Sequence, residues 1–413
     1  MNLTLLHLFL SSTFFLSDVK GNTSTKVNTL ISTLLNGYDK RTRPVKDQQY
    51  TLSIDVSFYL SIVNDVDEVA EKLVTTGYLY LTWTDQNLAW DSATNDINWI
   101  YLNQNDIWKP DLVLKNGFTK FKEMGGSFYY VYVYNSGDVT WKPYEVFETR
   151  CAIDITYFPY DKQTCEIIFI VWSYSVDEVA IHKSSNGIDF YEYEENSVWT
   201  VLYTESTINK DKYESEIIFT IYLQRKPRYY LMNIILPVLC LGLLSLLVFL
   251  IPVDGGEKMG YSITVFLSFA VFLSIISSEL PVNSESTSIL SFYLVLQMVI
   301  GTLELVISAI QLRLHHRKKT ADMSQIYIKI VKLDKGLRCK SWESCSRKVR
   351  VSANKIKKIE VSEVPDADHD TETRIEWSDV TSAIDFLSFC TIFIINISIT
   401  LYLFIAIIDN KEN

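Results

Sequence analysis

The chain has 413 residues, 48% of them hydrophobic, and a formal net charge of −11 at pH 7. This length predicts two domains, and hydropathy divides the chain into a polar first half and an apolar second half. The net charge is acidic, and we expect no nucleic-acid partner. The five histidines form no metal-ligand spacing, and neither a nucleophile elbow nor a phosphate loop occurs. We therefore expect a binding protein rather than an enzyme, without a metal or cofactor.

The first 21 residues contain an apolar run, broken by Ser and Thr, and end in a short polar stretch. This pattern indicates a secretory signal peptide at residues 1–21. A glycosylation sequon follows at Asn22. Residues 22–228 are expected to form an extracellular domain, and residues 22–224 carry 29 acidic against 16 basic side chains. An acidic outer domain would enrich cations within about 8 Å of its surface at physiological salt.

Regular short strands are indicated between residues 45 and 224, a segment rich in Tyr, Val, Ile and Trp. The segment from Thr51 to Phe58 alternates polar and apolar residues. The run from Phe128 to Tyr134 ends in the turn signal Asn-Ser-Gly-Asp. Such strands favour an extracellular all-β sandwich, and an amphipathic helix from Lys26 to Asn36 is expected before it.

Two of the six cysteines, Cys151 and Cys165, lie in the predicted extracellular domain. An even pair in an oxidising compartment predicts a disulfide. Thirteen residues lie between them. Closing a loop of that length should stabilise the fold by about 3 kcal/mol through the lost entropy of the unfolded chain.

Four apolar segments of the second half approach the roughly 20 residues that a bilayer core demands. They cover residues 231–251, 259–278, 288–312 and 386–408. From Arg313 to Lys358 there are fifteen Lys or Arg against three acids, which is typical of a cytoplasmic loop. The predicted organisation is three spans in residues 229–312, a cytoplasmic loop in 313–380, and a fourth span with a short extracellular tail in 381–413. Four spans after a cleaved signal place both chain ends outside the plasma membrane.

The second span is not apolar on every face. On a helix, six of its residues recur at spacings of four and three and form one stripe: Gly260, Thr264, Leu267, Val271, Ser274 and Ser278. The stripe is mostly small or hydroxylated, and the acidic residues Glu257 and Glu279 lie at its two ends. Such a helix resembles one of the helices that line an ion pore. The alternative is a packing face, since small residues also let membrane helices approach closely.

The segment Cys151–Cys165 has the sequence Phe-Pro-Tyr-Asp at its tip, and Trp172-Ser-Tyr follows seven residues after it. This segment resembles the signature loop of the Cys-loop receptors, the pentameric ligand-gated ion channels. Trp108-Lys-Pro-Asp, Trp83-Thr-Asp and Gly256-Glu-Lys are most similar to the nicotinic acetylcholine receptor branch. The resemblance implies a homo- or hetero-pentamer of related subunits around a pore lined by the second span. It also implies an extracellular small-molecule ligand bound at subunit interfaces. A postsynaptic location is left open.

For the pore, the resemblance assigns Glu257 to an inner acidic ring, where five carboxylates favour cations. It assigns Leu267 to a hydrophobic gate that closes by dewetting. The Pro-Ala insertion usual in anion-selective branches is absent. Gly260 is smaller than the Ser or Thr common at the narrow inner end, and Ser278 stands where many relatives have an acid. Monovalent cations are therefore the expected permeant ions, and calcium is left open.

For the ligand pocket, the resemblance implies Trp172 as the central wall, Tyr203 and Tyr213 as the mobile-loop tyrosines, and Tyr78 on the complementary face. Aromatic faces of this kind attract quaternary ammonium. Lys115 stands where the family has a Tyr, and it would repel such a ligand unless it points away or is paired. The vicinal cysteine pair of agonist-binding α subunits is also missing. The sequence therefore does not favour acetylcholine as the agonist.

Two alternatives remain open at this stage. One is a non-agonist-binding subunit that works only in hetero-pentamers, and the other is a membrane-anchored adhesion protein without a pore. For coupling, the resemblance implies a loop tip that presses on the linker from Pro281 to Ser288, formed by Phe158, Pro159, Tyr160 and Asp161. Arg225 matches the coupling arginine of the family, with Glu68 as its expected partner. Glu304 is an intramembrane acid and therefore a functional candidate, without a partner to name.

Overall fold

The computed structural model describes the following residues: 23–210, 213–253, 257–279, 287–317, 323–338 and 375–412. The predicted signal peptide, the sequon at Asn22 and the linker residue Pro281 lie outside them. The chain divides into two compact units. The first holds most of the β-strands, and the second holds the helices together with residues 68–70 and 153–163.

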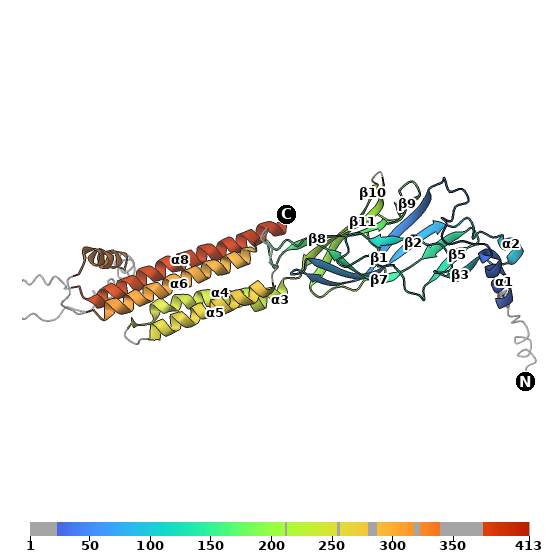
Figure 1. The fold of residues 1–413 in the computed structure, drawn as a ribbon. Helices are drawn as coiled ribbons and strands as arrows, with labels where there is room; N and C mark the ends of the chain where they lie inside the picture. The colour runs from blue at the N-terminus through green and yellow to red at the C-terminus, as the bar shows by residue number, and fades with distance from the viewer. Residues whose placement is uncertain are drawn as a thin grey trace, which may run out of the picture. The chain divides into compact units, whose positions relative to one another are not determined.

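The first unit begins with helix α1 (Ser24–Leu35) and contains two β-sheets (Figure 1). The seven-stranded sheet has the order β3 (Trp99–Asn103), β5 (Tyr130–Tyr134), β6 (Asp138–Trp141), β2 (Lys72–Thr84), β1 (Leu52–Asp67) and β9 (Val179–Lys183), and β7 (Tyr144–Arg150) also pairs with β2. The four-stranded sheet has the order β10 (Trp199–Lys210), β11 (Ser215–Arg225), β8 (Lys162–Val171) and β4 (Leu112–Leu114). A short helix, α2 (Ser92–Asn95), precedes β3. This architecture confirms the predicted β-sandwich with an N-terminal helix.

Alternating side chains of both sheets form the core of the first unit. Along β1, Ile54, Val56 and Phe58 are fully buried. The ring centroid of Phe58 lies 5.4 Å from that of Phe147 on β7 and 5.6 Å from that of Phe219 on β11. Because β11 belongs to the smaller sheet, these edge and tilted ring contacts join the two sheets.

Trp83 and Trp108 are core residues, and their rings meet edge to face with centroids 5.9 Å apart. The indole Nε1 of Trp108 donates to the hydroxyl of Tyr174 at 3.2 Å. Cys151 and Cys165 form the expected disulfide, with their Cα atoms 5.1 Å apart. The two motifs that contain these tryptophans therefore stabilise the sandwich and do not themselves offer an open binding surface.

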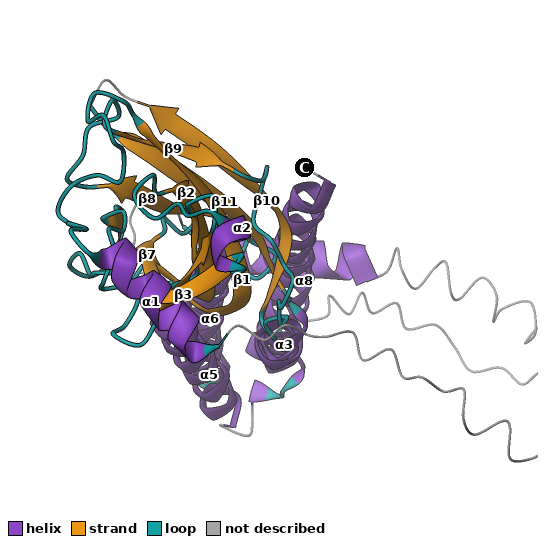
Figure 2. Ribbon diagram, turned by 90° about the vertical axis from the view of Figure 1, so that its right-hand side faces the viewer, coloured by secondary structure: helices purple, strands orange, loops and turns teal. Residues whose placement is uncertain are grey.

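Among the described residues, four helices of the second unit are long and apolar enough to cross a membrane. They cover residues 228–250, 257–278, 289–315 and 377–406. The first is built from α3 (Arg228–Tyr230), η2 (Leu231–Ile235), α4 (Leu236–Leu246) and η3 (Leu247–Leu250), and the others are α5 (Glu257–Glu279), α6 (Ile289–His315) and α8 (Trp377–Glu412). Figure 2 shows them as purple ribbons. Each overlaps one span predicted from hydropathy, so the predicted four-helix transmembrane domain is confirmed.

Helix α6 packs against both α5 and α8. Leu246, Ile300 and Ile392 contribute to one buried cluster from three different elements. Gly301 of α6 faces α5, where a Cβ at this position would make ordinary van der Waals contact with the ring of Phe266, at 3.4 Å. A further helix at residues 325–338 lies in the segment predicted to be cytoplasmic.

Gly77 of β2 offers a test of the sheet geometry, because it pairs with Leu60 beside a bulge in β1. A Cβ at position 77 would lie only 2.2 Å from the carbonyl oxygen of Tyr59. We expect Gly77→Ala to destabilise the protein by about 1–3 kcal/mol or more, because backbone must move to admit the methyl group. The measurement is the amount of protein at the cell surface and its thermal unfolding midpoint. Gly336→Ala, whose Cβ would meet nothing within 4 Å, is the control and should lower neither, because alanine is favoured over glycine in a helix. Equal losses in the two variants would contradict this account.

Candidate functional site

The residues predicted to line a pore lie on one face of α5. All seven are exposed in the isolated chain: Glu257, Gly260, Thr264, Leu267, Val271, Ser274 and Ser278. Leu267, near the middle of this face, is 59% exposed. The hydroxyls of Thr264 and Ser278 donate to carbonyl oxygens about one turn earlier in α5. The described helices of the same chain therefore leave this face uncovered.

The opposite face of α5 is buried at Val265, Phe269 and Ile276. Lys258 is also buried, where it forms an ion pair with Asp385 of α8. Gln311 of α6 donates to the same carboxylate at 2.9 Å. Successive residues of an α-helix are about 100° apart around its axis. With Lys258 held inward by Asp385, Glu257 projects away from the helix bundle.

Three aromatic side chains predicted for the ligand pocket are exposed. Trp172 directly follows β8, is 60% exposed, and makes an edge contact with Phe121 at a centroid distance of 4.6 Å. Tyr203 on β10 stacks on Tyr222 of β11 at 4.0 Å. Tyr213 precedes β11 and is also exposed. Exposed ring faces of this kind are what cation–π recognition of an ammonium group requires.

Lys115 is paired, so the repulsion of a cationic ligand that an unpaired lysine would cause is reduced. It directly follows β4, and its Nζ lies 2.7 Å from Glu216 and 3.1 Å from Glu214. Asn209 donates to the second carboxylate oxygen of Glu216 at 2.7 Å. One lysine and two glutamates leave the cluster with one net negative charge. Because β8, which leads into Trp172, lies between β4 and β11, this cluster also ties the sheet together.

The charges of this cluster support one another. Burial alone raises the pKa of Glu216, but hydrogen bonds from Lys115 and Asn209 outweigh it and hold that pKa below its ordinary value. Hydrogen bonds to Glu216 and Glu214 raise the pKa of Lys115. Lys115 and Glu216 therefore remain ionised near neutral pH.

Tyr78 lies on β2 of the larger sheet, whereas Trp172 follows a strand of the smaller sheet. The Tyr78 ring stacks on Tyr59 of β1 at a centroid distance of 4.7 Å. Sequence reasoning missed a further aromatic group, which lines a cavity of about 370 Å³ on the larger sheet: Tyr80, Tyr101, Tyr130, Tyr132 and Tyr134, with Thr140 and Lys142. The Tyr-Val alternation of residues 130–134 places its tyrosines on one face of β5, and this period of two could have identified the group.

Arg225, the last residue of β11, is the centre of a buried charge cluster. Its side chain is 1% exposed, and Nε and Nη2 donate to the two carboxylate oxygens of Asp161 at 2.7 and 3.0 Å. Its Nη1 lies 2.6 Å from Glu68 and donates to the hydroxyl of Tyr230 at 3.1 Å. The ring centroids of Phe158 and Tyr230 lie 5.0 and 5.3 Å from the guanidinium carbon. A planar guanidinium can make all these contacts at once, which a lysine ammonium cannot.

Sequence reasoning assigned Asp161 to the linker and missed its pairing with Arg225. The rest of the loop tip is buried or half-buried at Phe158, Pro159 and Tyr160. The same loop meets the start of α6 through backbone, because the N–H of Ile289 donates to the carbonyl oxygen of Thr156 at 3.0 Å. Ile289 directly follows the linker that the loop was predicted to contact, and residues 281–286 of that linker lie outside the described residues.

Comparison with known proteins identifies the family of this chain. Residues 27–227 match the neurotransmitter-gated ion-channel ligand binding domain, and residues 234–341 match the neurotransmitter-gated ion-channel transmembrane region. The chain belongs to the neurotransmitter-gated ion-channel family. Members of this family are ion channels, in agreement with the prediction that the chain is not an enzyme.

Relatives of this channel-family chain are acetylcholine receptor subunits, which confirms the predicted nicotinic resemblance. It is 30% identical to acetylcholine receptor subunit beta of Rattus norvegicus, over 74% of this chain and 65% of the relative. It is 32% identical to the Xenopus laevis beta subunit, over 69% and 60%. It is 31% identical to neuronal acetylcholine receptor subunit alpha-6 of Homo sapiens, over 73% and 62%. The matched region thus covers less than two thirds of the length of each relative. The four membrane-spanning helices and the similarity to these receptor subunits indicate a multi-pass plasma-membrane protein.

The Arg225 cluster predicts unequal effects of its two carboxylates. Asp161→Asn should destabilise the channel-family chain by about 3–5 kcal/mol, because it leaves a buried guanidinium without its bidentate partner. Glu68→Gln should cost about 1 kcal/mol or less, because the Glu68 side chain is 20% exposed. The measurement is the thermal unfolding midpoint of the purified full-length protein. Equal shifts for the two variants would show that Asp161 is not the principal partner.

The Lys115 cluster predicts a pH-dependent contribution to stability. Lys115→Gln should cost about 1 kcal/mol at pH 7, a small value because the lysine side chain is 41% exposed. Since the folded-state pKa of Glu216 is lowered, this contribution is present above the ordinary glutamate pKa of about 4.3 and is lost as pH falls further. Thermal unfolding of both proteins between pH 7 and pH 3 measures it. The double variant Lys115→Gln/Glu216→Gln is the control. If the difference in unfolding midpoint between Lys115→Gln and the wild type does not shrink on acidification, the pairing is contradicted.

Proposed function

We propose that this chain is a subunit of a cation-selective pentameric ion channel, gated by an extracellular small ligand that binds at subunit interfaces. The observation that carries the proposal is the uncovered face of α5. A membrane helix whose open face carries small and hydroxylated residues, with an exposed carboxylate at one end, is suited to line a water-filled pore. Five copies around an axis would enclose such a pore.

Cation selectivity follows from the charge at one end of this face. Glu257 is exposed, and its neighbour Lys258 is neutralised by Asp385 within the bundle. A ring of five Glu257 carboxylates would therefore attract cations without opposition from the adjacent lysine. Leu267 and Val271 are apolar and would form a hydrophobic constriction that closes by dewetting.

A ligand site between subunits agrees with the distribution of the aromatic residues. Trp172, Tyr203 and Tyr213 belong to or adjoin the smaller sheet, while Tyr78 belongs to the larger one. In a pocket between two neighbouring subunits, one subunit would contribute the aromatic residues of its smaller sheet and the other would contribute Tyr78 of its larger sheet. The net negative charge of the Lys115 cluster favours a cationic ligand over an anionic one. Ligand movement would reach the membrane helices through β11, whose last residue, Arg225, holds the loop that contacts α6.

A second candidate is a subunit that binds no agonist itself and works only in hetero-pentamers. The absence of a vicinal cysteine pair between Tyr203 and Tyr213 favours it. Similarity does not separate the two candidates, because the relatives include both beta and alpha-6 acetylcholine receptor subunits at nearly equal identity. An adhesion protein without a pore is disfavoured by membership of a channel family.

Whole-cell current from this chain expressed alone, with Leu267→Thr beside the natural sequence, tests the proposal. A polar residue at the hydrophobic constriction should give a standing cation current, or a larger response to a panel of cationic, zwitterionic and anionic ligands. Adding Glu257→Gln to Leu267→Thr should shift the reversal potential toward zero in a sodium chloride gradient, because the acidic ring is lost. Ser268→Ala, off the exposed stripe, should not change selectivity.

The outcomes separate the candidates. Current in the Leu267→Thr variant supports a homomeric channel and reduces the question to the ligand. Silence from both proteins, with each shown at the surface, would favour the obligate hetero-pentamer. A current that stays cation-selective when Glu257 is neutralised would overturn the assigned role of that residue.

A further inference from the structure

The face of α6 that points into the helix bundle is polar along much of its length. Gln297, Glu304, Ser308 and Gln311 recur at spacings of seven, four and three, so they lie on one side of the helix. Each is at most 3% exposed. At 1.5 Å per residue this stripe extends over about 21 Å, most of the thickness of a bilayer core. The interior of the bundle therefore contains a file of buried polar side chains, interrupted by Ile300 and Gly301 between Gln297 and Glu304.

At the two ends of this file, the side-chain amide nitrogens donate to residues of a neighbouring helix. Gln297 donates to Asn396 of α8 at 2.8 Å. At the other end, Gln311 donates to Asp385 of α8 at 2.9 Å, and Asp385 also pairs with Lys258 of α5. The middle of the file is different, because it contains the carboxylate of Glu304.

Several buried polar atoms of the file, and of α5 and α8, have no hydrogen-bond partner among the described residues. They are Oε1 of Gln297, Glu304 and Gln311, Oγ of Ser308 and Ser262, and Nδ2 of Asn396. Buried polar atoms without partners are uncommon in native proteins, and each costs about 1–3 kcal/mol. Their occurrence on three helices of the same bundle suits a site that takes up small hydrogen-bonding species.

Glu304 has no cationic partner in the described part of the chain. The groups that face it are the hydroxyl of Ser245 on α4, within hydrogen-bonding reach, and Tyr261 on α5, which interacts with it electrostatically. The nearest charged groups along the file are Lys258 and Asp385, which neutralise each other. An unpaired carboxylate in a dry interior is strongly unfavourable, and binding a proton removes the charge.

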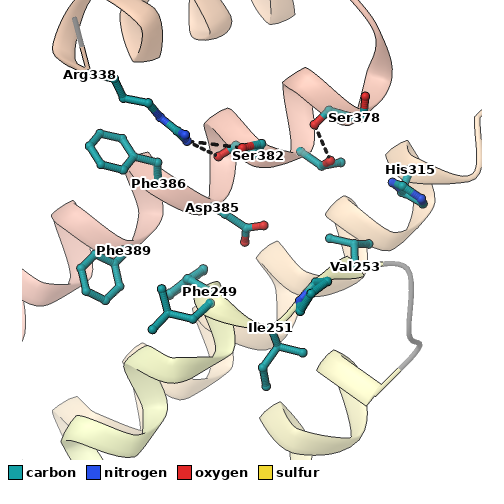
Figure 3. A pocket seen from close by; sticks show the side chains of 13 residues that line it. Phe249, Ile251, Val253, His315, Arg338, Ser378, Ser382, Asp385, Phe386 and Phe389 are labelled. Atoms are coloured by element: carbon teal, nitrogen blue, oxygen red, sulfur yellow. Dashed lines mark hydrogen bonds between the residues drawn. The ribbon is translucent and has the colours of Figure 1, made fainter. Parts of the chain in front are cut away.

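A cavity of about 600 Å³ gives access to the file at the cytoplasmic end of the bundle. Its lining includes Asp385, His315 and Arg338, above the rings of Phe249 and Phe389 (Figure 3). Figure 3 shows the Asp385 carboxylate projecting into this space. Asp385 leads to Gln311, and the next residues inward on the same face of α6 are Ser308 and Glu304, at rises of about 4.5 and 6 Å. Single water molecules can bridge polar groups at such separations.

We propose that Glu304 is a proton-binding site inside each subunit and that it exchanges protons with the cytoplasm through the cavity at Asp385. A hydronium ion delivered along the file transfers one proton to Oε1 of Glu304, giving a neutral carboxylic acid and a water molecule. The neutral acid can donate to a neighbouring hydroxyl, which the carboxylate cannot. Because Tyr261 and Lys258 lie on the pore-face helix α5, loss or gain of this proton changes the surface against which α5 rests. The site thus makes the bundle sensitive to cytoplasmic pH.

Infrared spectroscopy of the full-length protein, purified and reconstituted in phosphatidylcholine vesicles, tests the proposal without agonist or current. It is therefore independent of the proposed channel function. We expect the carbonyl stretching band of a protonated carboxylic acid at pH 7 in the wild type and its loss in Glu304→Gln. Gln preserves the size of the side chain, and a matching thermal midpoint would show that the variant folds. Asp379→Asn, which removes an exposed acid at the same end of α8, should retain the band.

Two further results decide the matter. Replacing sodium by a large organic cation should leave the band unchanged, whereas a band that appears only without sodium would show that Glu304 holds a metal cation instead. Ser308→Ala should slow the exchange of the acid proton for deuterium, since it removes a hydroxyl from the path. A spectrum of Glu304→Gln identical to that of wild type at pH 7 would overturn the proposal.

Discussion

The buried guanidinium of Arg225 is the interaction on which the junction between strand and helix depends. A cation at 1% exposure is tolerable only when it is fully paired, and here two carboxylates and two aromatic rings surround it. Its partners Glu68 and Asp161 lie far from it in sequence, so the pairing holds a turn, a loop and a strand end in one arrangement. The loop is held again where Ile289 bonds to Thr156. A loop fixed at both points cannot shift without moving α6 or Arg225, which is the property that a coupling element needs.

Two lysines, like Arg225, are paired with carboxylates of the same chain. Lys115 and Lys258 would both oppose a cation, and each is neutralised by acids of its own chain. Lys115 lies beside β8, the strand that leads into the exposed Trp172, and Lys258 lies beside Glu257. The second pairing does more than cancel charge. Because Lys258 is held inward, the rotation of α5 about its axis is set, and Glu257 is left on the uncovered face. The local charge next to both predicted sites is therefore negative, although lysines stand in both segments.

Much of the fold could be predicted because it depends on one-dimensional patterns. Alternation predicted the strand that contains Phe58, and hydropathy located all four spans. The pairings that shape the candidate sites are of another kind. Asp161 and Arg225 are 64 residues apart, and Lys115 and Glu216 are 101 apart. Their contacts depend on the order of strands in the smaller sheet and on side-chain direction, which no periodicity encodes. The family resemblance predicted Glu68 as the partner of Arg225, but it predicted that Asp161 contacts the linker from Pro281 to Ser288.

The two polar faces in the membrane show why hydropathy alone leaves function undecided. Helices α5 and α6 both have a mean hydropathy of 2.0 over their most apolar windows, and both carry a polar stripe. The stripe of α6 is covered by its own bundle, so its side chains must bond to one another or to small species held inside. The stripe of α5 is left uncovered by the described helices of its own chain, and in the proposed channel it would face the water of the pore. Burial, rather than composition, therefore distinguishes the interior stripe of α6 from the uncovered stripe of α5, and it is the uncovered stripe that supports the proposed assembly.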